Sequence, residues 1–258
     1  MWRIMILGLV QGFSEFLPIS SSGHLIVLRW LFRIASQGAE VEVMLHVGTL
    51  LAVIVGYRRD LAEMAKGLIH GDVEARHMVS MIIVATLPAV VTGYLLEMWI
   101  TQWFFPLAVG AGWLMTTAAL WLTPPAESGT KQISDIGWRS ALIMGLAQSL
   151  ALWPGLSRSG TTIFSGRVLG LAPIEAARFS FYMAIPIISG ASVLTFASGD
   201  RMVLGSLWTL GLGLGVAAIS GIFAIKWVKH ALATTRLWQQ FGWYTLALGL
   251  VTLWLGGF

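Results

Sequence analysis

A polar segment rich in glycine and serine occurs twice in this chain, and the sequence around both copies is strongly apolar. The first copy spans 8–26 and reads GLVQGFSEFLPISSSGHLI, and the second spans 145–163 and reads GLAQSLALWPGLSRSGTTI. Aligned without gaps, the copies share Gly8/Gly145, Leu9/Leu146, Gln11/Gln148, Ser20/Ser157, Ser22/Ser159, Gly23/Gly160 and Ile26/Ile163. A duplicated break in a membrane-spanning pattern indicates a binding site where the two copies meet.

The composition predicts a polytopic membrane protein. Hydrophobic residues make up 57% of the chain and charged residues 11%, whereas soluble domains carry about 25% charged residues. Apolar runs long enough to cross about 30 Å of hydrocarbon lie at 78–100, 103–122, 179–198, 202–225 and 241–258, with a weaker run at 40–57. The chain has no cysteine, which excludes disulfides and thiolate chemistry. Its basic residues form no stripe, so nucleic acid is not an expected partner.

Each half of the chain is predicted to hold one broken segment followed by three membrane-spanning helices. The similarity continues at the same spacing, since 43–57 aligns with 180–194, 81–97 with 218–234 and 107–121 with 244–258. The broken segments carry too many Gly, Ser, Pro and charged residues to run as lipid-facing helices, so they must be buried in protein or line a wet cavity. We read them, at about 4–28 and 140–167, as re-entrant helix hairpins.

The expected fold is therefore all-α, with six transmembrane helices and two re-entrant hairpins in an inverted internal repeat. It forms a single membrane domain over 1–258, in which 1–125 is the first repeat and 138–258 the second. Three crossings per half is an odd number, so the second repeat is inverted and the two hairpins approach each other from opposite faces of the bilayer.

Loop charges predict the orientation, because cytoplasmic loops are enriched in Lys and Arg. One side has only Arg3, Arg29, Arg33 and Arg201. The other side collects Arg58, Arg59, Lys66, Arg76, Lys131, Arg139, Arg167, Arg178, Lys226, Lys229 and Arg236. We therefore expect a multi-pass protein of the cell inner (plasma) membrane with both termini outside the cytoplasm.

The first hairpin offers a carboxylate and an imidazole. Gln11 and Glu15 are four residues apart and share a helix face, and Pro18 ends that helix before the turn that leads to His24. A Ser/Gly turn at a helix N-terminus supplies hydroxyl and N–H donors for phosphate oxygens. Ionisable residues inside a membrane are functional by default, although Glu15 could be a neutral structural group and His24 a packing residue.

The second hairpin offers a fixed cation, because Arg158 stands where the first copy has Ser21. A guanidinium binds phosphate through a planar fork and stays charged when buried. Arg158 could also be no more than the salt-bridge partner of Glu15. Glu40, Glu42 and His46 lie near a helix entrance, where a solvated cap is at least as good an interpretation as a role in the site.

The two segments resemble the signatures of a known family. QGFSEFLPISSSGH and PGLSRSGTTI are similar to those of the bacitracin-resistance family of undecaprenyl-diphosphate phosphatases, and EVMLHVGT at 42–49 is similar to a third family segment. The resemblance covers nearly the whole chain. It implies a membrane hydrolase that removes one phosphate from the C55 isoprenoid diphosphate and so recycles the lipid carrier of peptidoglycan and cell-wall synthesis. The family fold has six spanning helices and two inverted re-entrant hairpins, with a site open toward the outer face.

The resemblance also implies roles for individual residues. It makes Glu15, Ser21, His24 and Arg158 catalytic. The residues implied to bind the diphosphate are Gln11, Ser20, Ser22, Ser157, Ser159, Gly160, Thr161 and Thr162. The chain departs from the family at Gln11, where many members carry Glu, which weakens the case for a metal site there.

Several mechanistic points follow as hypotheses. Mg²⁺ or Ca²⁺ would bind at Gln11 and Glu15, because these ions favour oxygen ligands. His24 would transfer protons, because imidazole titrates near neutral pH. Either Ser21 or a water molecule would attack phosphorus, with Arg158 stabilising the developing charge.

The alternatives from other classes are a polyprenyl-phosphate flippase that uses the same midplane site and a catalytically dead lipid-binding relative. The predicted partners are the polyprenyl diphosphate lipid, membrane lipids and a second copy of the chain in a homodimer.

Overall fold

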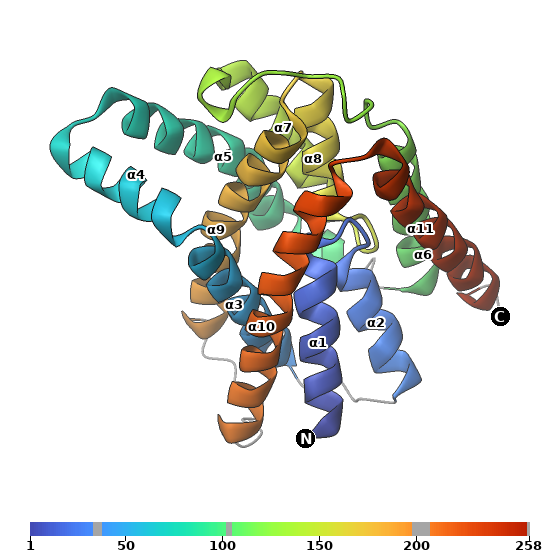
Figure 1. The fold of residues 1–258 in the computed structure, drawn as a ribbon. Coiled ribbons are helices and arrows are strands. Elements are labelled where there is room, and N and C mark those ends of the chain that lie inside the picture. Colours follow the sequence, from blue (N-terminus) through green and yellow to red (C-terminus); the bar gives the residue numbers. More distant parts are fainter. Residues whose placement is uncertain (33–37, 102–104, 198–206, 257–258) are drawn as a thin grey trace.

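The structure is a computed structural model that describes residues 1–32, 38–101, 105–197 and 207–256. Within these ranges the chain forms α-helices and one short 3-10 helix at Ile133–Asp135, and it forms no strand (Figure 1). The helices are α1 (Trp2–Phe16), α2 (Ser21–Leu31), α3 (Gly38–Gly56), α4 (Arg58–His70), α5 (Val73–Thr101), α6 (Pro106–Trp121), α7 (Trp138–Leu150), α8 (Arg158–Val168), α9 (Pro173–Ala197), α10 (Leu207–Ala231) and α11 (Thr235–Gly256).

Three of the described helices are long and apolar enough to cross a membrane, namely Val73–Leu96 within α5, the whole of α9, and Trp208–Ala231 within α10. A fourth span arises if α3 and α4, which meet at an angle of 76°, count as one bent segment. The all-helical membrane class predicted from composition is therefore confirmed, while the number of six crossings stays a prediction. α6 and α11 cover the described parts of the remaining two predicted runs.

Two details bear on the charge-based orientation. Arg33 and Arg201 lie outside the described residues. The Arg167 side chain is buried and donates to the backbone carbonyl groups of Pro125 and Leu171. Arg167 therefore ties the end of α8 to the loop between α6 and α7 and to the residues after α8, instead of acting as an exposed loop charge.

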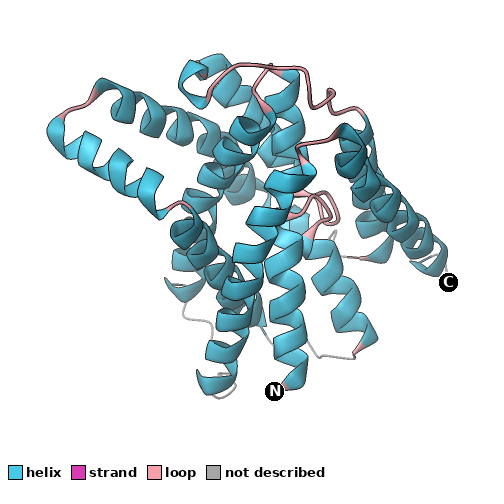
Figure 2. Cartoon of the chain, in the orientation of Figure 1, coloured by secondary structure: helices cyan, strands magenta, loops and turns pink. Residues whose placement is uncertain are grey.

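Each broken segment folds as two helices joined by a non-helical turn. The turn at 17–20 joins α1 to α2, and the turn at 151–157 joins α7 to α8. As Pro18 predicts, α1 ends at Phe16, and Leu17 is extended. The two turns lie side by side near the middle of the molecule (Figure 2). The backbone N–H of Gly155 donates to Ser22 Oγ (3.4 Å), which joins the two hairpin tips directly.

The two turns are built alike, which explains the repeated serines and glycine. Ser20 caps the N-terminus of α2 by accepting a hydrogen bond from the Gly23 N–H (3.3 Å), and Ser157 caps α8 from Gly160 (3.1 Å). Serine is among the preferred residues at this position, because its oxygen satisfies an otherwise unpaired N–H. The duplicated Ser-x-Ser-Gly pattern is thus a capping motif in both hairpins.

Each hairpin packs mainly against a helix from the opposite half of the chain. α1 runs along α10, and α7 runs along α5. The matched glycines make these approaches close, since a Cβ at Gly8 would collide with the Gly213 carbonyl and one at Gly145 with the Ala85 carbonyl. The largest buried core cluster fills the space between the halves and includes the edge-to-face pair Phe16 and Phe181. This packing brings the two hairpin tips into contact.

Candidate active site

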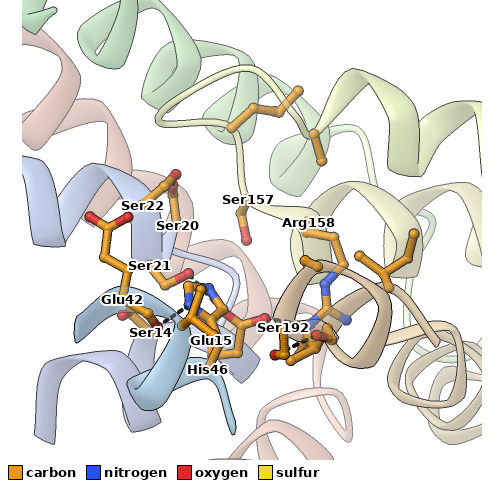
Figure 3. Close-up of a pocket in the computed structure, with 16 residues that line it drawn as sticks. Ser14, Glu15, Ser20, Ser21, Ser22, Glu42, His46, Ser157, Arg158 and Ser192 are labelled. Carbon is orange, nitrogen blue, oxygen red and sulfur yellow. Dashed lines mark hydrogen bonds and ion pairs between the residues drawn. The ribbon is translucent and has the colours of Figure 1, made fainter. Parts of the chain in front are cut away.

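A cavity of about 300 Å³ lies beside the point where the hairpin tips meet (Figure 3). Most of its polar lining comes from both hairpins and from α3, and half of its apolar lining comes from α9. The lining residues are Ser14, Glu15, Ser20, Ser21, Ser22, Glu42, Val43, His46, Ala151, Leu156, Ser157, Arg158, Ile187, Ile188, Ala191 and Ser192.

An ion pair between the two hairpins forms the charged centre of this cavity. Arg158 Nη2 lies 2.6 Å from Glu15 Oε1, and the two side chains are only 16% and 7% exposed. Arg158 Nη1 also donates to the Ser180 carbonyl oxygen of α9 (3.2 Å). The expected meeting of an acidic tip and a guanidinium tip is therefore present. Removing either partner would leave an uncompensated buried charge, which is strongly unfavourable.

The second oxygen of Glu15 accepts hydrogen bonds from its own hairpin. Ser21 Oγ donates to Glu15 Oε2 over 2.7 Å, and Gln11 Nε2 donates to the same oxygen over 3.1 Å. The Ser21 hydroxyl proton therefore points at the carboxylate. A carboxylate in this position can accept that proton when the serine oxygen reacts.

His24 is turned away from the cavity. Its Nδ1 lies 2.7 Å from the Ser20 carbonyl oxygen, which can only accept, so Nδ1 carries the hydrogen. Nε2 is then the acceptor for the Tyr244 hydroxyl of α11 (2.8 Å), and the two rings stack. Both ring nitrogens have protein partners, and His24 is not among the lining residues.

His46 of α3, for which the sequence left open a solvated cap or a role in the site, lies beside Glu15 and lines the cavity. Its Nδ1 donates to the Glu42 carbonyl oxygen (2.7 Å), so the imidazole presents Nε2 to the cavity. This nitrogen lies 3.6 Å from Glu15 Oε2, close enough for electrostatic contact with the carboxylate. Glu42 is itself fixed by Arg29, whose Nη1 lies 2.7 Å from Glu42 Oε1.

The other predicted site residues divide into two groups. Ser20, Ser22 and Ser157 line the cavity. The remainder lie behind its wall, where Thr161 Oγ1 donates to the Ser157 carbonyl, Thr162 Oγ1 lies 2.6 Å from Ser180 Oγ, and Ser159 Oγ donates to the Leu17 carbonyl. The residues outside the lining are Gln11, His24, Ser159, Gly160, Thr161 and Thr162.

Sequence reasoning left undecided the part of the cavity that α3 supplies, and it missed the part that α9 supplies. His46 had a signal, because it stands four residues after Glu42 inside the segment EVMLHVGT. Ile187, Ile188 and Ala191 had none, since apolar residues in an apolar helix look the same whether they face a ligand, protein or lipid.

The side-chain oxygens of Gln11 and Glu15 are not arranged to bind a divalent cation. Gln11 turns its N–H toward Glu15, and its carbonyl oxygen is buried without a hydrogen-bond partner among the described residues. Both Glu15 oxygens are already engaged, one of them by a guanidinium. Within the described part of the chain, three or more His, Asp or Glu residues nowhere gather as a metal site would need. The expected Mg²⁺ or Ca²⁺ thus stays a prediction that these contacts do not favour.

Comparisons with known proteins cover nearly the whole chain. The sequence model of a family described as "Bacitracin resistance protein BacA" matches residues 4–251. A protein named undecaprenyl-diphosphatase from Desulfosudis oleivorans is 37% identical over 98% of this chain and 97% of its own length. Proteins of the same name from Thermomicrobium roseum and Sorangium cellulosum are 37% and 34% identical, over 98% and 97% of this chain and 96% and 85% of their own lengths.

Proposed function

This chain belongs to the bacitracin resistance protein BacA family, and from that premise we infer that it is an undecaprenyl-diphosphatase. It hydrolyses undecaprenyl diphosphate to undecaprenyl phosphate and phosphate, and thereby recycles the lipid carrier of cell-wall synthesis. The resemblance of its two signatures to this family is confirmed. The relatives give no support to the flippase alternative. The cavity around the Glu15–Arg158 pair is the observation that supports placing this reaction between the two hairpins.

We propose that the protein is embedded in the inner membrane as two inverted repeats, 1–125 and 138–258, with six spanning segments. The two helix pairs α1–α2 and α7–α8 are then re-entrant hairpins. Their similar capped turns and their exchanged packing against α10 and α5 support this arrangement. The loop charges support both termini lying outside the cytoplasm.

The diphosphate occupies the polar end of the cavity, next to Arg158 and the serines of both turns. A guanidinium in a low-dielectric site stabilises charge on phosphate oxygens more strongly than it does in water. The prenyl chain is too long for the cavity and leaves along its apolar wall, formed by Val43, Ile187, Ile188 and Ala191. The lipid tail thus stays among the helices while the headgroup reacts.

Ser21 is the nucleophile in this proposal, because its hydroxyl already donates to Glu15. Its Oγ forms a bond to the terminal phosphorus, the bond from that phosphorus to the bridging oxygen breaks, and the hydroxyl proton passes to Glu15. Undecaprenyl phosphate leaves with the bridging oxygen. Water then cleaves the phosphoserine, releases phosphate and restores the hydroxyl. Arg158 holds the charge that develops on the phosphoryl oxygens.

His46 is the proton-transfer group for the leaving phosphate, in place of the His24 expected from the sequence. Its Nε2 faces the cavity beside Glu15, whereas both nitrogens of His24 have partners in the protein. A general acid must lie within reach of the atom to which it gives its proton. The homodimer stays a prediction.

Phosphate release in detergent tests this function. Purified protein should convert undecaprenyl diphosphate to equal amounts of undecaprenyl phosphate and inorganic phosphate. Arg158→Ala should lose this activity, while Arg139→Ala, which removes an exposed arginine near the start of α7, should keep it. A wild-type protein that moves the lipid across sealed vesicles but never cleaves it would overturn the proposal in favour of the flippase.

A further inference from the structure

Gln11 and Glu15 lie one helical turn apart on α1. Their hydrogen bond occupies a Glu15 oxygen that a cation would otherwise use as a ligand. Gln11 is fully buried, and its Nε2 lies 3.1 Å from Glu15 Oε2. We infer that the Gln11 amide replaces a divalent cation at this site, so that the phosphatase reaction proceeds without a metal ion bound to Glu15. This inference rests on the proposed function for its consequence in catalysis, but its binding test is independent of activity.

The amide orientation follows from the chemistry of the pair. If the Gln11 side chain were flipped, its carbonyl oxygen would face the carboxylate oxygen at hydrogen-bond distance with no proton between them, which is repulsive. A cation bound by both residues would require that flipped orientation, because it needs oxygen ligands. The hydrogen bond between Gln11 and Glu15 therefore competes directly with metal binding.

Glu15 has little left to offer a cation. Oε2 accepts from Ser21 and Gln11, and Oε1 accepts from Arg158. A dication here would have to displace at least one of these donors and would lie close to the guanidinium charge, which repels it. Arg158, serine hydroxyl groups and the helix N-termini remain to stabilise the phosphate charge, and none of these requires a metal.

The repeat supplies a matched control at Gln148 of α7, which aligns with Gln11. Gln148 is also buried, and its Oε1 also has no partner among the described residues. Its Nε2 donates to the Ala85 carbonyl over 3.5 Å, and Leu152 stands four residues on, where the first repeat has Glu15. A glutamate at position 11 would create a carboxylate pair, whereas a glutamate at position 148 would stand alone.

Direct titration with Mn²⁺, followed by electron paramagnetic resonance, tests the inference on protein first stripped with EDTA. Wild-type protein should bind no Mn²⁺ at or below about 1 mM, the weak end of protein sites for hard cations. Gln11→Glu should gain one Mn²⁺ site with a Kd at least about tenfold below that limit of about 1 mM, because cation affinity rises with the number of charged ligands. Gln148→Glu should behave as wild type. In parallel, EDTA should change wild-type phosphate release less than about twofold.

Tight Mn²⁺ binding by wild-type protein that Glu15→Gln abolishes would overturn the inference. If Gln11→Glu does not fold, the comparison of wild type with Glu15→Gln decides the question alone. A wild-type protein that binds no Mn²⁺ and releases no phosphate would refute the proposed function while leaving the inference about Gln11 standing.

Discussion

At the scale of single residues, Glu15 is the point on which the contacts of the site converge. A buried carboxylate is costly unless it is paired and hydrogen-bonded, and Glu15 has a guanidinium, a hydroxyl and an amide as partners. Two of these groups come from its own hairpin and one from the other. The ionic state of Glu15 therefore depends on the correct assembly of both halves.

The two histidines give a first prediction. His46→Ala should lower phosphate release by about 10²–10⁴-fold, the usual contribution of general acid–base catalysis, and His24→Ala should lower it much less. Tyr244→Phe is the matched control for His24, because it removes only the hydroxyl that donates to Nε2. Initial rates of phosphate release from undecaprenyl diphosphate decide which histidine transfers the proton. A larger loss in His24→Ala than in His46→Ala would assign proton transfer to His24.

The sequence was sufficient to expect Glu15 and Arg158 at one site, where the structure pairs them, because charged residues inside apolar sequence carry a strong signal. Ser21 was singled out only by the resemblance to the family. The sequence was not sufficient to choose between His24 and His46. That choice depends on Tyr244, which lies far along the chain in α11 and occupies the second nitrogen of His24. It also depends on a backbone carbonyl of α3 that fixes the His46 ring.

At the scale of elements, the hairpin turns were predictable and the packing of the hairpins was not. Pro18 and the Ser-x-Ser-Gly motifs mark where α1 ends and where α2 and α8 begin, and the structure places these boundaries there. The contacts of α1 with α10 and of α7 with α5 had no comparable signal. Small apolar residues such as Gly213 and Ala85 occur in many helices, and only the assembled fold selects these partners.

Gly155 gives a prediction at this scale, because it lies in the second turn with a φ of +86° and a Cβ there would collide with Val109. Gly155→Ala should destabilise the protein by about 1–3 kcal/mol and reduce activity by displacing the turn that carries Arg158. Gly215→Ala is the control, since this mid-helix position of α10 has open space and alanine favours helix by about 1 kcal/mol. Thermal unfolding in detergent measures both, and equal midpoints for the two variants would contradict this account of the turn.

At the scale of the whole molecule, the membrane class predicted from composition is confirmed, while the six crossings and the orientation stay predictions. α6 has only 16 residues and α4 bends away from α3 by 76°. Among the described residues, length and apolarity therefore identify three spans, or four with the bent pair. The buried Arg167 shows why loop charge is an imperfect guide, since one of the counted residues serves packing.

Reporter fusions test the proposed orientation. Alkaline phosphatase fused after the last residue should be active, and green fluorescent protein fused there should be dark, because the former matures only outside the cytoplasm and the latter inside. A fusion after Glu127, in the loop between α6 and α7, should give the opposite pair of results. Fluorescence from the C-terminal fusion would contradict the proposed orientation. It would place the C-terminus in the cytoplasm and each hairpin on the opposite side of the membrane.

The most direct test of the central claim is a double-mutant comparison of kcat/KM for undecaprenyl diphosphate across the Glu15–Arg158 pair. Glu15→Gln and Arg158→Gln should each lower it by at least about 100-fold in protein that still unfolds cooperatively on heating. The kcat/KM of the double variant should be about equal to that of the less active single variant, because residues that act as one unit do not lose activity additively. Near-wild-type turnover in either folded single variant, or losses that multiply, would contradict a catalytic centre built by these two hairpins.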